Sequence, residues 1–323
     1  MSALARRPAV IHEEEDLTLP IPNGFRLASG DALPDTHIKA RWFGDRRRPV
    51  VLALGGISAG RDVCGDAGWW RETIRDEGAV DLERFSVLGF NFAPISDARV
   101  RLAPDDQARL IELALDALGI RRLHAFVGAS YGGLVGLAFA AHAPARLERL
   151  CAISAAHRQA AQSLAWRGVQ RRIVEFGLAH GDADGGLSLA RQLAMITYRT
   201  PDEFEARFGA GVDASGVGEV DRYLRNRGAA YTQVAATQRW LTLSESIDRA
   251  TVNPSLVTAR TTLIASPEDQ LVPFGIVKEL SGRLPNLHAL HILPSLYGHD
   301  AFLKEPVRLA PLISQCLEEQ AYV

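Results

Sequence analysis

Short apolar runs that alternate with helix-like segments constrain the fold of this chain more than any other feature. PVVLALGG (49–56) is a continuous apolar run that ends in glycines, which is typical of a strand buried on both faces of a sheet. Similar strands are predicted at FSVLGFNF (85–92), RLHAFVG (122–128) and LERLCAIS (147–154). Helices are predicted between them at 105–118 and 132–143. This alternation predicts a mostly parallel sheet with helices on both faces.

The alternation of strand and helix stops after residue 154 and returns near residue 250. Residues 155–250 contain one helix-like segment after another, and strand character reappears at 261–267 and 287–293. The sequence therefore predicts a core domain made of 1–154 and 251–323, interrupted by a helical lid at 155–250. At the N-terminal side, FRLASG and HIKARWFG alternate in polarity and predict an antiparallel hairpin.

Composition excludes several classes of function. The 323 residues carry a formal net charge of −2, so no long-range field attracts nucleic acid or an anionic membrane. The three cysteines lack CxxC spacing, which argues against a disulfide framework and against a zinc site. No apolar run approaches the roughly 20 residues of a membrane span. We expect a protein of the reducing cytoplasm, with no metal and no bound cofactor.

Ser130 lies between two glycines where a predicted strand ends and a predicted helix begins. The pattern Gly128-Ala129-Ser130-Tyr131-Gly132 in this context is typical of a nucleophile elbow, a sharp turn that exposes a serine at the edge of a sheet. The alternative is a tight turn whose serine only caps the helix. The context favours the nucleophile.

A serine nucleophile needs a base and an acid. In proteins with a nucleophile elbow, both residues follow the serine along the chain, and the acid comes before the base. His299 lies in the loop PSLYGHDAF after the last predicted strand and is the expected base. Glu268 and Asp269 follow the strand TTLIASP, and Asp269 is our choice for the acid, with Glu268 as the fallback. The alternatives are a surface loop histidine and a solvated turn carboxylate.

An oxyanion hole needs two backbone N–H groups close to the serine. We expect one from Tyr131, directly after the nucleophile, and the other from Leu54 at the end of the first buried strand. The segment around Leu54 is equally consistent with a plain strand end.

Taken together, these residues resemble the homoserine O-acyltransferase family, whose members have the α/β-hydrolase fold. The resemblance runs from about Pro49 to Lys304. It includes these segments: GWW (68–70), DALG (116–119), QSLAWRGVQR (162–171), ARQLAMITYRT (190–200), EVDRYL (219–224), DQLVP (269–273) and GHDAFL (298–303).

The resemblance implies acyl transfer from acyl-CoA, as co-substrate, to the hydroxyl of L-homoserine in methionine biosynthesis. The route is ping-pong, with Ser130 acylated, His299 moving protons and Asp269 orienting it. It further implies that Arg171 binds the acceptor's α-carboxylate, that Tyr198 lines the pocket and that Asp300 pairs with the α-ammonium. Without the resemblance, we would favour structural roles for all three: Arg171 on a solvated helix face, Tyr198 as a packed core ring and Asp300 as a helix cap.

The chain departs from the family pattern near the pocket. The family's His-x-Leu-Thr-Gly corresponds to Leu52-Ala53-Leu54-Gly55-Gly56 here, and an expected asparagine is Arg167. Family frequency favours acetyl-CoA, with succinyl-CoA close behind. An extra arginine, among Arg167, Arg99 and Arg101, would favour a succinyl group with its free carboxylate.

Three alternatives remain open at the level of sequence. In the first, the acyl acceptor is serine instead of homoserine. In the second, the same triad hydrolyses a small ester or thioester. In the third, the protein has this fold but binds a ligand without catalysis. The resemblance also implies a homodimer formed through the helical lid. Nucleic acid and membrane are not expected partners.

Overall fold

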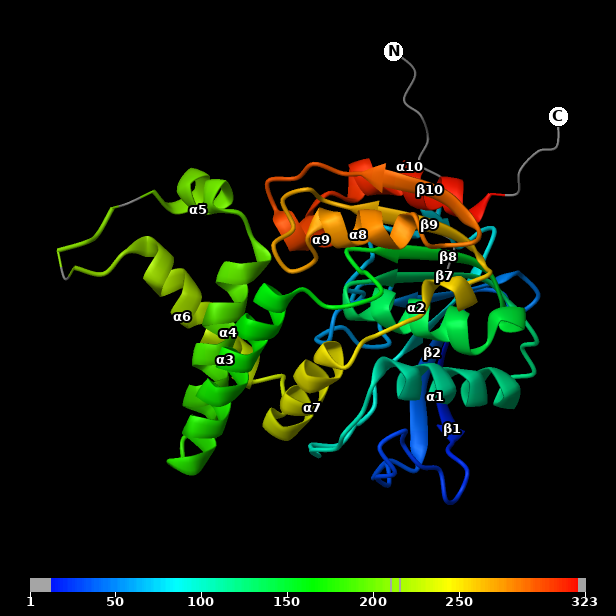
Figure 1. Cartoon of the computed structure of the whole chain (residues 1–323), viewed down its shortest axis with the longest axis horizontal. Helices are drawn as coiled ribbons and strands as arrows, with labels where there is room; N and C mark the ends of the chain where they lie inside the picture. The colour runs from blue at the N-terminus through cyan, green and yellow to red at the C-terminus, as the bar shows by residue number, and fades with distance from the viewer. Residues whose placement is uncertain (1–12, 210, 215, 319–323) are drawn as a thin grey trace, which may run out of the picture.

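The computed structural model describes residues 13–209, 211–214 and 216–318, which form an α/β core with a helical arm on one side (Figure 1). The core contains an eight-stranded sheet in the order β1-β2-β6-β3-β7-β8-β9-β10. Its strands are β1 (Glu14–Pro20), β2 (His37–Phe43), β3 (Val50–Leu54), β6 (Ser86–Phe90), β7 (Leu123–Ala129), β8 (Leu147–Ile153), β9 (Arg260–Ala265) and β10 (Leu287–Ile292). From β6 to β10 neighbouring strands run parallel, whereas β1 and β2 are antiparallel. The predicted mostly parallel sheet is confirmed.

The two faces of the sheet bury alternate residues of each strand, as the two-residue repeat of a strand requires. In β3, Leu52 and Leu54 face one hydrophobic cluster, and Val51 and Ala53 face the other. The first cluster lies under α1 (Pro104–Ala117), α2 (Tyr131–His142) and α8 (Phe274–Ser281). The second lies under α9 (Ala301–Lys304) and α10 (Pro306–Leu317). Helices therefore cover both faces.

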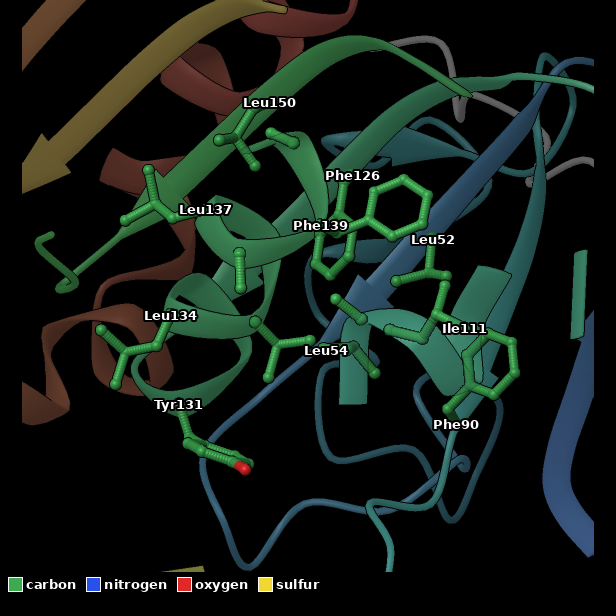
Figure 2. Close-up of a cluster of buried hydrophobic side chains, with 14 of the residues drawn as sticks. Leu52, Leu54, Phe90, Ile111, Phe126, Tyr131, Leu134, Leu137, Phe139 and Leu150 are labelled. Atoms are coloured by element: carbon green, nitrogen blue, oxygen red, sulfur yellow. The ribbon is translucent and has the colours of Figure 1, made fainter. Parts of the chain in front are cut away.

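Figure 2 shows part of the first cluster, where strand side chains meet the helix that follows the elbow. Phe126 of β7 stacks obliquely on Phe139 of α2, with ring centroids 6.0 Å apart. Both rings are fully buried. This packing holds α2 against the centre of the sheet and thereby fixes the direction in which the chain leaves β7.

The predicted hairpin has the correct second strand but the wrong first one. β2 pairs with β1, and its register joins Leu17 to Ala40 and Leu19 to Ile38. FRLASG contributes only an isolated bridge between Arg26 and Ala32. Leu17 and Leu19 alternate with exposed residues and are buried, so β1 supplies the apolar face that this edge of the sheet needs.

Five helices lie between β8 and β9, where the sequence analysis expected a lid. They are α3 (Ala161–Ala179), α4 (Ala183–Tyr198), α5 (Pro201–Phe208), α6 (Glu219–Thr232) and α7 (Thr237–Asp248). We call residues 161–248 the helical insertion. In Figure 1 it projects sideways from the core, beyond the ends of the central strands. A small cluster around Val174, Leu187 and Leu241 packs α3, α4 and α7 together.

Across the described ranges, we find no helix that combines the length and the apolar character needed to cross a bilayer.

Candidate active site

Ser130 occupies a strained turn between β7 and α2, at the carboxyl end of a central strand. Its backbone has φ 56° and ψ −120°, a conformation that a residue with a side chain rarely adopts. Steric crowding requires glycine on both sides of Ser130. A Cβ on Gly128 would lie 2.3 Å from the carbonyl oxygen of Gly132, and a Cβ on Gly132 would lie 2.4 Å from the carbonyl oxygen of Leu54. The turn has the geometry of a nucleophile elbow, and strain of this kind is typical of functional sites.

The structure brings Ser130, His299 and Asp269 together from three separate parts of the chain. His299 Nε2 lies 2.8 Å from Ser130 Oγ, and His299 Nδ1 lies 2.8 Å from Asp269 Oδ2. Both distances are those of hydrogen bonds. The three side chains form the linear relay that the sequence predicted, with the imidazole between hydroxyl and carboxylate.

The two neighbouring carboxylates that the sequence left as alternatives point to different partners. Asp269 is 3% exposed, and its Oδ1 accepts hydrogen bonds from the N–H groups of Leu271 and Val272, each at 2.9 Å. These bonds hold the carboxylate so that Oδ2 faces the imidazole. Glu268 instead accepts from the Ser266 hydroxyl and the Ser295 N–H. Asp269 therefore fits the position of the acid, and Glu268 braces the loop before the histidine.

The environment of His299 favours its protonated form. Burial is the largest influence and opposes the positive charge, but the Asp269 carboxylate outweighs it through its charge and its hydrogen bond. The pKa of the imidazole is therefore raised above its usual value of 6.5. An imidazole of this kind can hold a proton taken from the serine during reaction.

Tyr131 and Gly56 both line the cavity beside Ser130, so their backbone N–H groups are candidates for an oxyanion hole. Tyr131 is the first residue of α2, and N–H groups of the first turn have no acceptor within their helix. Gly56 lines the cavity in front of Ser130, and a Cβ built on it would lie 3.9 Å from Ser130 Oγ.

Leu54, the second donor predicted for the oxyanion hole, is the last residue of β3 and is not among the residues that line the cavity. β3 continues through Leu54, which pairs in register with Gly128 and is 1% exposed. Its peptide group is thus part of the sheet, and the chain reaches the cavity two residues later, at Gly56. The apolar run 49–56 that predicted this strand extends two residues past its end at Leu54, and the last residue of the run, Gly56, lines the cavity.

A cavity of about 270 Å³ opens in front of the relay, between the core and the helical insertion. The core supplies Ser130, His299 and Asp300 to its lining, and the insertion supplies residues of α3, α4 and α7. The insertion residues at the cavity include Arg167, Arg191, Tyr198 and Ser244. Ser130 is half-buried beneath this roof.

Arg171, which the resemblance implied as the ligand of a carboxylate, is not among the residues that line the cavity. Its Nη2 is paired with Asp248 at 2.6 Å, and its Nη1 donates to the carbonyl and hydroxyl oxygens of Ser244. The guanidinium is therefore engaged within the insertion. The helical repeat places Arg171 on the same face of α3 as Arg167, one turn away, and only Arg167 reaches the cavity.

The sequence analysis missed Arg191, which lines the cavity from α4. Its guanidinium lies over two aromatic rings, 5.4 Å from the centroid of Tyr198 and 4.6 Å from that of Tyr231. Within the part of the chain that the structure describes, no carboxylate forms an ion pair with it. The available signal was its spacing from Tyr198: seven residues are two helical turns, which places both side chains on one face.

Tyr198 and Asp300 both line the cavity as predicted. The Tyr198 ring centroid lies 6.0 Å from that of His299. Burial raises the pKa of Asp300, and positive charges nearby, including Arg199 and Arg191, partly offset this effect. Arg199 Nε lies 3.5 Å from Asp300 Oδ2, so the charge of this half-buried carboxylate is partly compensated.

The structure separates the three arginines that the sequence analysis considered for a second anion. Arg99 pairs with Glu175 and Glu245, and Arg101 pairs with Asp31. Neither lines the cavity, whereas Arg167 does.

Comparison with known proteins agrees with this geometry. A family model described as the α/β hydrolase fold matches residues 49–306. The chain is 41% identical over 295 residues to a homoserine O-succinyltransferase of Xanthomonas campestris pv. campestris, covering 88% of this chain and 79% of that protein. The chain belongs to the homoserine O-acyltransferase family. The family assignment and the α/β-hydrolase fold predicted from sequence are confirmed.

Two further acyltransferases of this family share less sequence with the chain. A homoserine O-acetyltransferase of Leifsonia xyli subsp. xyli is 29% identical over 343 residues, covering 87% of this chain and 84% of that protein. The crystal structure of a homoserine O-acetyltransferase from Bacillus anthracis superposes with a TM-score of 0.83 at 17% identity, covering 96% of this chain and 98% of that one. At this identity the superposition supports the fold alone.

Proposed function

We propose that this protein transfers an acyl group from an acyl-CoA to the side-chain hydroxyl of L-homoserine, a step of methionine biosynthesis, through an acyl ester on Ser130. The observation that carries the proposal is the combination of the Ser130–His299–Asp269 relay with a roofed cavity. Among the described residues, this cavity contains an arginine, Arg191, with no carboxylate partner, and a half-buried aspartate, Asp300. The family membership of the chain supports the same reaction.

In the first half-reaction, Ser130 Oγ attacks the thioester carbonyl carbon while His299 Nε2 takes the hydroxyl proton. Asp269 keeps the proton of Nδ1 in place and stabilises the imidazolium. The negative charge that develops on the carbonyl oxygen is held by the N–H groups of Tyr131 and Gly56. The C–S bond then breaks, and CoA leaves as a thiol with the proton from His299.

In the second half-reaction, the acceptor hydroxyl takes the position that the thiol has left. His299 removes its proton, the oxygen attacks the acyl carbon, and the Ser130 ester breaks as His299 returns a proton to Oγ. The helical insertion excludes water, which would otherwise hydrolyse the acyl-enzyme.

An amino-acid acceptor is a zwitterion and requires one fixed cation and one fixed anion. We assign the α-carboxylate to Arg191 and the α-ammonium to Asp300. The two rings beside Arg191 hold its guanidinium in place without neutralising it. The Tyr198 ring lies 5.4 Å from the Arg191 guanidinium and 6.0 Å from the His299 ring, and it contributes to the wall of the acceptor site.

Replacing Arg191 with glutamine is expected to raise the KM for homoserine about a hundredfold, because a charge-assisted hydrogen bond to the carboxylate is lost. Steady-state kinetics at saturating acyl-CoA measures this. Arg171→Gln is the matched comparison, since it removes a guanidinium that lies outside the cavity. A raised KM in Arg171→Gln together with an unchanged one in Arg191→Gln would restore Arg171, the residue implied by the family resemblance, as the ligand of the carboxylate.

The release of CoA from acyl-CoA, followed with and without homoserine, tests the function. We expect release to accelerate strongly with homoserine and to yield the O-acyl product. Release that ignores the amino acid would instead identify a thioesterase with the same triad. Serine, which is one methylene shorter, is the second acceptor to test, and faster transfer to serine than to homoserine would revise the acceptor.

We further infer a homodimer formed through the helical insertion, in the cytoplasm. Apolar side chains on α3 and α4 remain exposed in the single chain, among them Phe176 at 67% and Leu189 at 56%. The three cysteines are free and buried, in keeping with a reducing compartment. Sedimentation velocity is expected to give the mass of two chains, and Phe176→Asp is expected to shift it toward one. A monomeric wild-type protein at micromolar concentration would refute the dimer.

A further inference from the structure

Arg167 presents an incompletely satisfied guanidinium to the same cavity as Ser130. The residue is 8% exposed. Its Nε donates to Asp248 at 2.5 Å and its Nη2 to Gln159 at 2.9 Å. Its Nη1 has no hydrogen-bond partner in the described ranges. A guanidinium has five N–H donors, so Arg167 retains donors for a ligand in the cavity.

The charges around Arg167 do not balance. Asp248 is the one carboxylate that pairs with Arg167 among the described residues, and it also pairs with Arg171. Two guanidinium groups thus share one carboxylate, which leaves about one positive charge in a largely buried place. Burial is the main influence on the pKa of Arg167 and lowers it, which reflects the cost of keeping this charge out of water. A bound anion would offset that cost.

The other charged groups of the cavity already have partners or a role. Arg158 donates two hydrogen bonds to Glu279 and its side chain is 48% exposed. Arg191 and Asp300 are assigned above to the two charges of the acceptor. One cation, Arg167, is therefore left for a second anionic group, and its charge is close enough to affect the pKa of His299.

We propose that Arg167 selects the acyl donor by binding the free carboxylate of a succinyl group carried on Ser130. This inference rests on the proposed acyl transfer. An extended succinyl chain places its two carboxyl carbons about 4 Å apart, from ordinary C–C bond lengths. The acid group thus lies in the cavity when the carbonyl is at the serine. An acetyl group ends at a methyl and leaves Arg167 without an anion.

A comparison of three donors tests this role: succinyl-CoA, butyryl-CoA, which has the same carbon number without the carboxylate, and acetyl-CoA. For the wild-type protein we expect kcat/KM for succinyl-CoA to exceed that for butyryl-CoA by at least about tenfold. Arg167→Asn is expected to remove most of this ratio, and Arg167→Lys to restore part of it, since lysine keeps the charge but not the planar fork. The readout is a ratio within one variant, so a general loss of activity does not affect it.

Arg171→Gln is the matched control, because it also removes one partner of Asp248 but does not line the cavity. Its ratio is expected to stay within about twofold of the wild-type value. A wild-type protein that uses butyryl-CoA as well as succinyl-CoA, or a succinyl preference that persists in Arg167→Asn, would overturn this inference and leave acyl transfer standing. Absence of transfer from all three donors would overturn both proposals.

Discussion

Ser130→Ala is expected to lower kcat for acyl transfer by about 10⁶-fold, the loss typical of removing the nucleophile from a serine triad. No acyl-enzyme can form without Oγ, so the variant also loses the burst of CoA release and the acyl adduct detectable by mass spectrometry. The fold is expected to survive, because the substitution removes one hydroxyl and the hydrogen bond to His299. Its effect on the free energy of unfolding is about 1 kcal/mol.

Ser154→Ala is the matched control for this prediction. Ser154 also lines the cavity, is 3% exposed and has a positive φ of 48°, yet it has no hydrogen bond to the relay among the described residues. We expect it to keep kcat within about tenfold of wild type, as for a residue outside the charge relay. Equal losses in the two variants would mean that the cavity wall, rather than the Ser130 hydroxyl, limits the reaction.

Asp269→Asn is expected to lower kcat by about 10⁴-fold and to change the pH profile. An amide that keeps its oxygen on the Leu271 and Val272 N–H groups turns its NH₂ toward His299. The imidazole then carries its proton on Nε2, where it cannot accept one from the serine.

The same substitution changes the acid limb of kcat/KM, which reports the pKa of His299 in the free enzyme. Because Asp269 raises this pKa, the wild-type limb is expected above pH 6.5, and the Asp269→Asn limb at lower pH. Glu268→Gln is the control: its carboxylate contacts Ser266 and Ser295, so both kcat and the limb should remain close to wild type. An unshifted limb in Asp269→Asn would contradict the assigned relay.

The core of the fold and the relay follow closely from local sequence. Continuous apolar runs identify buried strands. The elbow requires glycines at 128 and 132 because the backbones of β7, α2 and β3 lie so close together there that a Cβ atom would clash. The chain order serine, acid, histidine then assigns Asp269 and His299, because loops at the carboxyl ends of parallel strands meet at one edge of the sheet. These features depend on short segments whose structure is fixed by their own residues.

Helix periodicity predicts only part of which residues line the cavity. It shows that Arg167 and Arg171 share one face of α3, and that Arg191 and Tyr198 share one face of α4. It does not show which turn of a helix reaches the cavity, because that depends on the angle at which the insertion packs on the core. The resemblance therefore implies Arg171, whereas the structure places Arg191 and Arg167 at the cavity.

By itself, then, the sequence determined the α/β class, the helical insertion, the strained serine and its two partners, since each is encoded by local pattern and order along the chain. Tertiary structure alone decided that β1 rather than FRLASG pairs with β2 and that Gly56 rather than Leu54 lines the cavity in front of the serine. It also decided which arginines lie at the cavity. The physical reason is that strand pairing, strand ends and ion pairs are set by competition among distant groups, such as the single Asp248 carboxylate shared by two guanidinium groups.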